Sequence, residues 1–167
     1  MICSDELRPV IERTLHGELR AVLAGTVDAN LMHASAEGIA RAVGPVISRA
    51  ERDRERELVA QLGRELGAGG RAAAGLDEVL SMLAQQQVET LVVPERSELR
   101  AGVCPTCGRL STDGGRRCAL DGQALAEVDA VEHAIEEAAR QSAQVVVVRH
   151  EREWLHQHGD FAALLRW

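Results

Sequence analysis

The sequence contains no lysine and no tyrosine, and its only aromatic residues are one phenylalanine and two tryptophans. All of its basic side chains are therefore arginines, which together with the many alanines, glycines and valines indicates the coding bias of a GC-rich genome. No run approaches the roughly 18 consecutive apolar residues that a membrane span requires. Residues 1–6 also lack the basic start and apolar core of a signal peptide. We therefore expect a cytoplasmic protein that does not bind membranes.

Positive charge is outnumbered, because 19 arginines stand against 26 acidic residues and give a formal net charge of −7 at pH 7. Residues 1–75 hold 11 acidic residues and 10 arginines, whereas residues 76–167 hold 15 acidic residues and 9 arginines. A protein that binds nucleic acid over a broad surface normally carries the opposite charge. Strong direct RNA binding by the second part of the chain is therefore disfavoured, although a local basic patch is compatible with these numbers.

Cysteine is sparse and unevenly placed: Cys3 stands alone, whereas Cys104, Cys107 and Cys118 are clustered. A secreted scaffold held by disulfides has a denser set of cysteines in a much shorter chain. We therefore expect reduced cysteines and, for the clustered three, metal binding.

The first part of the chain, residues 1–66, is expected to consist of helices and one short strand. An apolar run over residues 19–27 predicts the strand, with a turn at 28–30. A long helix follows over residues 35–66, in which Gly44-Pro45 should cause a bend or a local irregularity. The mixed charges in the middle of this helix are typical of a solvated helix face, and a partner-docking surface is the alternative.

A glycine-rich segment ends the long helix, since residues 67–71 read Gly-Ala-Gly-Gly-Arg. A phosphate-binding loop would need a preceding strand and a Gly-Lys-Ser/Thr ending, and this segment has neither. We interpret residues 67–74 as a linker between two domains.

The second part, residues 75–167, alternates between helix and strand signals. We expect five features in order: a helix from Gly75, a strand over 88–93, a polar insertion over about 98–123, a helix over 124–140 and a strand over 145–148. The strand over 145–148 consists of four valines, which predicts that it is buried on both faces of its sheet.

A final strand is expected over residues 161–167, beside residues 145–148, with Phe161, Leu164 and Leu165 in the core. A strand–helix–strand connection of this length is right-handed. The sequence thus predicts a layered α/β/α domain.

The most specific chemical signal is the segment Cys104-Pro105-Thr106-Cys107-Gly108. Two thiolates separated by two residues can bind one Zn²⁺ from a tight turn, and the glycine accommodates that turn. The second half of a zinc ribbon would be Cys118 to Gly122, with Asp121 in place of the fourth cysteine. Cys104, Cys107, Cys118 and Asp121 are therefore the candidate ligands of a structural zinc ion.

Several other interpretations of this segment remain open. Asp121-Gly122 can be a simple turn, and the site can be a ribbon that has lost its metal. A redox dithiol would need the start of a thioredoxin-like helix, and a catalytic zinc would need a nearby general base. His156 and His158 would reach the metal only if the chain folded back, and the six histidines form no catalytic motif.

Three segments resemble the C-terminal domain of the archaeal and eukaryotic class-1 peptide-chain release factors and Pelota. Residues 75–80 (GLDEVL) and 87–93 (QVETLVV) resemble the start of that domain. Residues 158–167 (HGDFAALLRW) resemble its closing Gly-Gly-Ile-x-x-Leu-Leu-Arg-aromatic signature, and the Cys-Pro-x-Cys-Gly knuckle resembles the archaeal members. The preceding segment is similar to the end of the family's ribonuclease-H-like middle domain. The arginine-only bias suggests a bacterial relative.

The resemblance implies an L7Ae-like α/β/α sandwich that docks translation GTPases and ribosome-associated partners, in ribosome rescue, hibernation or a related role. Peptide release in the family depends on a Gly-Gly-Gln loop, and this chain has no such tripeptide, since Gly69-Gly70-Arg71 differs in sequence and in place. Asp160 and Phe161 also replace the usual Gly and Ile. Kink-turn RNA binding, known for L7Ae-like folds, is doubtful given the acidic balance.

The sequence thus favours a translation-associated binding module without catalytic residues of its own. It would contain the end of a middle domain and a docking domain that carries a metal knuckle. Two alternatives are a metal-dependent hydrolase that uses the cysteine site and an oligomerisation domain built on the long helix. A metal with an open coordination position would indicate the hydrolase, and a closed four-ligand site the binding module.

Overall fold

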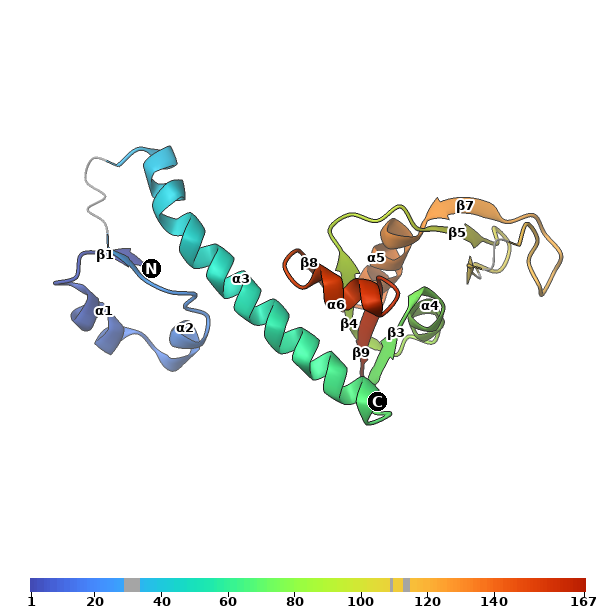
Figure 1. Cartoon of the computed structure of the whole chain (residues 1–167), viewed down its shortest axis with the longest axis horizontal. Helices are drawn as coiled ribbons and strands as arrows, with labels where there is room; N and C mark the ends of the chain where they lie inside the picture. Colours follow the sequence, from blue (N-terminus) through green and yellow to red (C-terminus); the bar gives the residue numbers. More distant parts are fainter. Residues whose placement is uncertain (29–33, 109, 113–114) are drawn as a thin grey trace. The chain divides into compact units, whose positions relative to one another are not determined.

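The computed structural model describes residues 1–28, 34–108, 110–112 and 115–167. The chain divides into two compact units, Met1–Arg56 and Glu57–Trp167, and the boundary falls inside helix α3 (Ala36–Gly67) (Figure 1). The expected linker, 67–74, lies within the second unit, because its last residues form a strand of that unit's sheet.

Among residues 1–28, the described part of the chain before α3, the elements are β1 (Ile2–Cys3), α1 (Arg8–Thr14), α2 (Gly17–Ala21) and β2 (Val27–Asp28). The two strands pair in parallel, with Ile2 opposite Val27. The amino group of Met1 donates a hydrogen bond to the carbonyl of Gly25 (2.7 Å), which holds the start of the chain beside the second strand.

The strand expected over residues 19–27 is wrong for most of its length, because residues 17–21 form α2. Glu18 lies in the first turn of this helix, where an acidic side chain is favoured, and the residues that follow are good helix formers. Leu19 and Val22 are exposed, so the apolar run does not mark a buried strand. The expected turn at 28–30 falls largely outside the described residues.

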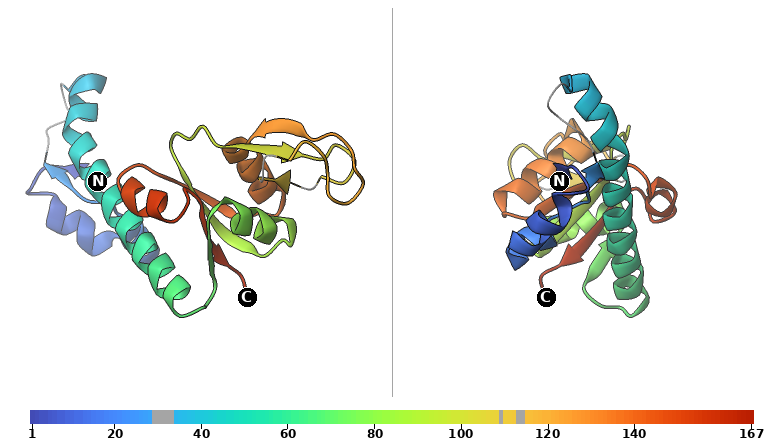
Figure 2. Two further views of the ribbon diagram at one scale, coloured as in Figure 1. Left: turned by 45° about the vertical axis from the view of Figure 1, so that its right-hand side comes forward. Right: turned by 90° about the vertical axis from the view of Figure 1, so that its left-hand side faces the viewer.

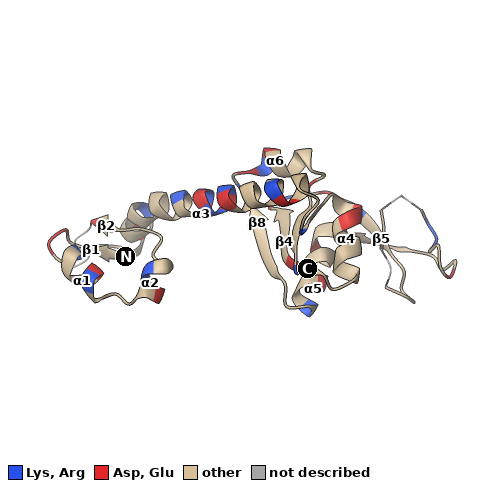
Figure 3. Ribbon diagram, turned by 90° about the horizontal axis from the view of Figure 1, so that it is seen from below, with Lys and Arg blue, Asp and Glu red and all other residues tan. Residues whose placement is uncertain are grey.

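Helix α3 confirms the long helix expected over residues 35–66 and continues through Pro45 without interruption. Proline has no backbone N–H, so the carbonyl of Arg41 lacks its usual helical partner at this point. Acidic and basic residues are interspersed along the middle of the helix (Figure 3). Most residues between 51 and 57 are exposed, and Glu55 is the buried exception among them.

The second unit is built on a four-stranded sheet with the order β3-β9-β4-β8 (Figure 1). Its strands are β3 (Ala72–Ala74), β4 (Val88–Pro94), β8 (Gln144–Val148) and β9 (Ala162–Leu165). β4 and β8 are parallel, with Val92 opposite Val146, whereas β9 is antiparallel to both of its neighbours. The strands expected over 88–93, 145–148 and 161–167 are confirmed, with small changes at their ends.

The expected pairing of the last strand is wrong, because β9 lies between β3 and β4 and not beside β8. All four residues of β9 are buried, whereas Val147 of β8 is 41% exposed because β8 is an edge strand. The expected burial of residues 145–148 on both faces is therefore also wrong, because an apolar run does not specify whether a strand lies in the interior or at the edge of its sheet.

Helices cover both faces of this sheet (Figure 2). They are α4 (Leu76–Ala84), α5 (Ala130–Arg140), α6 (Arg152–Gln157) and the end of α3. On one face, α4 and α5 form a core with Leu91 and Phe161. On the other face, α6 and Leu62 of α3 pack against Val92 and Leu164. The expected layered arrangement and the burial of the last strand are thereby confirmed.

A second, three-stranded antiparallel sheet forms between β4 and α5, with the order β6-β5-β7. Its strands are β5 (Arg100–Val103), β6 (Leu110–Ser111) and β7 (Ala126–Asp129). The helix expected from residue 124 therefore begins later, at Ala130. Asp129 caps it, since the carboxylate accepts hydrogen bonds from the N–H groups of Val131 (2.9 Å) and Glu132 (3.0 Å).

None of the helices in the described part of the chain is both long enough and apolar enough to cross a membrane.

Candidate metal site

Two tight turns place the three clustered cysteines and Asp121 at the end of the three-stranded sheet. In the first, which follows β5, the N–H of Gly108 donates to the carbonyl of Cys104 (2.8 Å), and the φ of Gly108 is +71°. In the second, the N–H of Gly122 donates to the carbonyl of Cys118 (2.9 Å), and the φ of Gly122 is +69°. Because a positive φ of this size favours glycine, both turns carry a glycine four residues after a cysteine.

The equivalence of the two turns defines the position of Asp121. The first turn has cysteines at its first and fourth positions, Cys104 and Cys107. The second turn has Cys118 at its first position and Asp121 at its fourth. The carboxylate therefore occupies the place that corresponds to the second cysteine of the first turn.

A short hairpin holds the second turn. Arg117 and Ala124 form an antiparallel bridge, and inside it the N–H of Cys118 donates to the carbonyl of Gln123 (2.8 Å). The guanidinium of Arg117 donates to the carbonyl of Gly122 (3.0 Å). These bonds fix the backbone that presents Cys118 and the aspartate three residues later.

The ligand atoms of the four side chains all lie within 4.8 Å of one another. The Sγ atoms of Cys107 and Cys118 are 3.7 Å apart. The Sγ of Cys104 lies 3.3 Å and 3.6 Å from the two carboxylate oxygens of Asp121. The structure thus brings together all four residues that the sequence singles out.

These distances suit a tetrahedral zinc site. With Zn–S bonds of about 2.3 Å and Zn–O bonds of about 2.0–2.2 Å, tetrahedral angles place two sulfurs about 3.8 Å apart and a sulfur and an oxygen about 3.5–3.7 Å apart. The observed separations of 3.7 Å and of 3.3–3.6 Å agree with both values. Two of the six donor pairs thus have the separations of a tetrahedral site, and the ligand atoms of the other pairs lie within 4.8 Å of each other.

The local hydrogen bonds also favour the charged form of the fourth ligand. The backbone N–H of Gln123 donates to the carboxylate of Asp121 (3.0 Å), and the side chains of Cys118 and Cys104 add further hydrogen bonds. These bonds hold the pKa of the Asp121 carboxyl below its usual value. A carboxylate that is already ionised is ready to bind a cation.

Histidines do not belong to this group of residues within the described chain. In and after α6, the Nδ1 of His156 lies 3.1 Å from the carboxylate of Asp160, and the Nδ1 of His158 lies 2.7 Å from the carbonyl of Trp154. The rings of His158 and Trp154 also stack, with centroids 4.0 Å apart. Cys3 belongs to the other unit.

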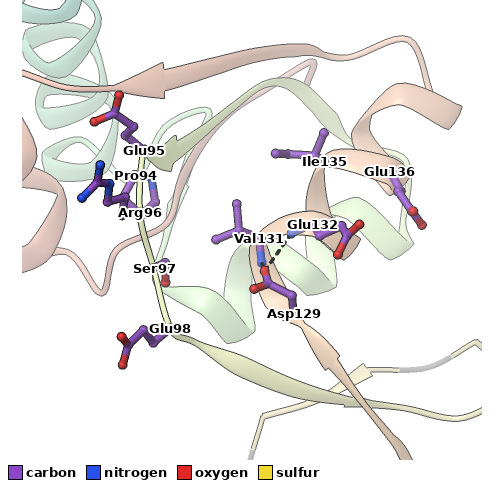
Figure 4. A pocket seen from close by; sticks show the side chains of 10 residues that line it. All are labelled: Pro94, Glu95, Arg96, Ser97, Glu98, Asp129, Val131, Glu132, Ile135 and Glu136. Atoms are coloured by element: carbon purple, nitrogen blue, oxygen red, sulfur yellow. Dashed lines mark hydrogen bonds between the residues drawn. The ribbon is translucent and has the colours of Figure 1, made fainter.

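An acidic cleft of about 860 Å³ lies in the second unit, where β4 ends and α5 begins (Figure 4). Its acidic side chains are Glu95, Glu98, Asp129, Glu132 and Glu136, and Arg96 is the only arginine among the described residues that line it. This cleft has no local sequence motif, because its acids come from two segments about 30 residues apart. The acidic excess of residues 76–167 was the available signal.

The acidic side chains of the cleft differ in the partners that they have within the chain. Asp129 is used as the helix cap, and Glu95 forms ion pairs with Arg149 (3.1 Å) and with Arg152. Glu98 and Glu132 line the cleft from its two sides and are exposed to solvent. The cleft suits a partner that carries basic side chains.

No family model matches the sequence, and no curated protein matches it. Solved structures do match. The C-terminal domain of a peptide chain release factor from Methanosarcina mazei has a TM-score of 0.57 at 24% identity, over 81% of this chain and 97% of that one. The archaeal Pelota of a ribosome-bound Pelota and ABCE1 assembly has a TM-score of 0.54 at 22% identity, over 86% of this chain. Dom34 of S. cerevisiae, a termination-like factor that interacts with Hbs1, has a TM-score of 0.55 at 10% identity, over 98% of this chain.

This chain spans 36% of the length of that Pelota and 42% of the length of Dom34. At identities below 25%, the likeness establishes the fold. The chain has the mixed α/β fold of the C-terminal domains of release factors and Pelota, as the sequence resemblance implies.

Proposed function

We propose that this chain is a translation-associated docking module, which binds a ribosome-linked partner such as a translation GTPase. The observation that carries the proposal is the fold likeness to an isolated release-factor C-terminal domain, which is matched over 97% of its length. Two proteins of similar fold have translation partners: one is bound to the ribosome with ABCE1, and the other interacts with Hbs1. The role would be ribosome rescue, hibernation or a related task, in a bacterial relative of the family.

The finer architecture belongs to the same proposal. The sheet between α4 and α5 on one side and α6 and the end of α3 on the other would be an L7Ae-like sandwich, with the three-stranded sheet as a metal-knuckle insertion. Zinc bound by Cys104, Cys107, Cys118 and Asp121 would be structural. All four positions of a tetrahedral site would be filled by protein side chains, which leaves none for a substrate.

The acidic cleft indicates the charge of the partner surface that would bind to it. Its exposed carboxylates favour a basic partner surface, and exposed ion pairs weaken as salt screens them. The relevant surface on a translation GTPase would therefore carry arginines or lysines.

Neutralising two carboxylates of the cleft tests this docking surface. Glu98→Gln together with Glu132→Gln should weaken binding to a purified translation GTPase about three- to tenfold, since an exposed ion pair contributes about 0.2–1 kcal/mol. The loss should appear mainly in the association rate and should shrink at high salt. Biolayer interferometry at low and high ionic strength measures both rates.

The matched control is Glu89→Gln together with Glu153→Gln, which removes the same charge from exposed positions outside the cleft. This variant should bind as the unmodified chain does. Equal affinities for the two double variants would rule out the cleft as the docking surface.

We also propose that the chain has no peptidyl-tRNA hydrolase activity. Hydrolysis needs a group that positions water against the ester, and the chain has no Gly-Gly-Gln tripeptide for this task. In an assay that measures release of labelled peptide from stalled ribosomes, the chain should match the rate of the buffer control, with a release factor as the positive control. Turnover by the chain would show that the non-catalytic assignment is wrong.

A further inference from the structure

The three-stranded sheet has two chemically different faces. Ala101, Leu110 and Val128 pack against the core of the second unit. Side chains alternate between faces along a strand, and directly paired residues lie on the same face. Gly102, which pairs with Ser111 and Glu127, therefore belongs to the face that points away from the core.

A hollow of about 420 Å³ lies on this outward face. Its floor is formed by Gly102 and Leu125, and the Leu125 side chain fills the place that a side chain at Gly102 would take, 2.9 Å from an added Cβ. The floor is thus apolar, because the Leu125 side chain lies over the backbone of the central strand at Gly102.

Polar and basic groups surround the floor. Ser111 and Thr112 contribute hydroxyl groups, and Arg100 and Arg116 contribute two guanidinium groups. Glu127 is the acidic side chain among the lining residues that the structure describes; it lies 3.9 Å from the Arg100 guanidinium, and both side chains are mostly exposed (60% and 78%). The hollow therefore combines two cations, two hydroxyls and one loosely held anion.

The charge of this part of the chain is opposite to that of its surroundings. Residues 100–117 hold four arginines and one acidic residue, whereas the other residues of the second unit, 57–99 and 118–167, hold 7 arginines and 16 acidic residues. An anion would be repelled by most of the second unit and attracted to this one surface. The positive charge of residues 100–117, and not the net charge of −7 of the whole chain, determines which ligands this surface attracts.

We propose that this hollow binds the phosphate backbone of RNA. The planar guanidinium groups of Arg100 and Arg116 match the geometry of phosphate oxygens, and the hydroxyls of Ser111 and Thr112 add neutral donors. The apolar floor suits the sugar between two phosphates. Because the rest of the second unit is acidic, binding is confined to this surface, is independent of RNA sequence and depends strongly on salt. The site does not depend on the proposed docking of a translation GTPase.

The test is a fluorescence anisotropy titration of labelled single-stranded RNA of about 12 nucleotides with the 167-residue chain, at about 50 mM salt and above. Arg100→Gln together with Arg116→Gln should weaken binding about tenfold or more. The slope of log K against log salt should become shallower by about 1.4, because each single-strand phosphate contact contributes about 0.7. Arg64→Gln together with Arg140→Gln removes the same charge outside the hollow and should leave affinity and slope unchanged.

Unchanged circular dichroism and metal content would show that the hollow variant is folded. Competition by millimolar inorganic phosphate, beyond that of chloride at equal ionic strength, would identify phosphate as the recognised group. Absence of RNA binding by the unmodified chain, or an equal slope for the two double variants, would overturn the proposal. Binding of a poly-glutamate peptide as tight as that of RNA would also overturn it, since the ligand would then be an acidic polypeptide.

Discussion

Replacing Phe161 with alanine is expected to destabilise the second unit by about 3–5 kcal/mol, the usual cost of removing a buried phenylalanine side chain. Phe161 is fully buried in the core between the sheet and the α4–α5 layer, and it immediately precedes the interior strand β9. A loss of this size is a large part of the stability of an ordinary domain, about 5–15 kcal/mol. Urea denaturation followed by circular dichroism measures it.

Trp167 provides the matched control at the same end of the chain. It is 68% exposed, so Trp167→Ala should change the free energy of unfolding by no more than about 0.5 kcal/mol. Deletion of residues 161–167 should have the largest effect, because it removes β9, leaves β3 without a strand partner and leaves β4 paired only with β8. A deleted chain that keeps its cooperative transition would contradict the central position of this strand.

The second large effect is expected from substitution of a proposed zinc ligand, which should remove the metal and loosen the structure around it. If the four donors hold zinc, the purified chain should contain about one zinc ion, and Cys107→Ser should lose it. Cys107 is the suitable position because its side chain is exposed, so serine there leaves no buried cavity. Hydrogen exchange should then become fast between residues 100 and 129, whereas the four-stranded sheet should keep its protection.

Cys3→Ser is the control for the chemistry of the substitution, since Cys3 belongs to the other unit and should not affect the metal. Asp121→Cys should retain zinc and bind it more tightly, because a thiolate is the stronger ligand. Elemental analysis measures the zinc content of the unmodified chain and of each variant. Protein prepared without a chelator that contains no metal would contradict the site.

The sequence predicts most of the elements of the second unit because their patterns are local. The valines at 145–148 and the helix after Gly75 are visible in short windows, and Cys104, Cys107, Cys118 and Asp121 form a recognisable spacing. The ligand positions are local to two turns of five residues, so only the approach of the two turns depends on tertiary structure.

The pairing of strands is not local and was predicted wrongly. β9 and β8 are both apolar, and the choice of neighbour depends on helix packing and on β3, three alanines that carry no distinct strand signal. The strand expected at 19–27 failed for a different reason: a short apolar run with good helix formers is ambiguous between the two structures. The acidic cleft and the arginine-lined hollow arise from tertiary structure, since each combines side chains of separate segments.

Co-sedimentation with ribosomes tests the proposed translation role most directly. The chain should pellet with ribosomes, or with ribosomes that carry a translation GTPase, at low ionic strength, and it should be released as salt rises. The Glu98→Gln and Glu132→Gln double variant should pellet less, whereas the Glu89→Gln and Glu153→Gln control should pellet as the unmodified chain does. If the unmodified chain stays in the supernatant at every salt concentration, with and without the GTPase, the translation role is wrong.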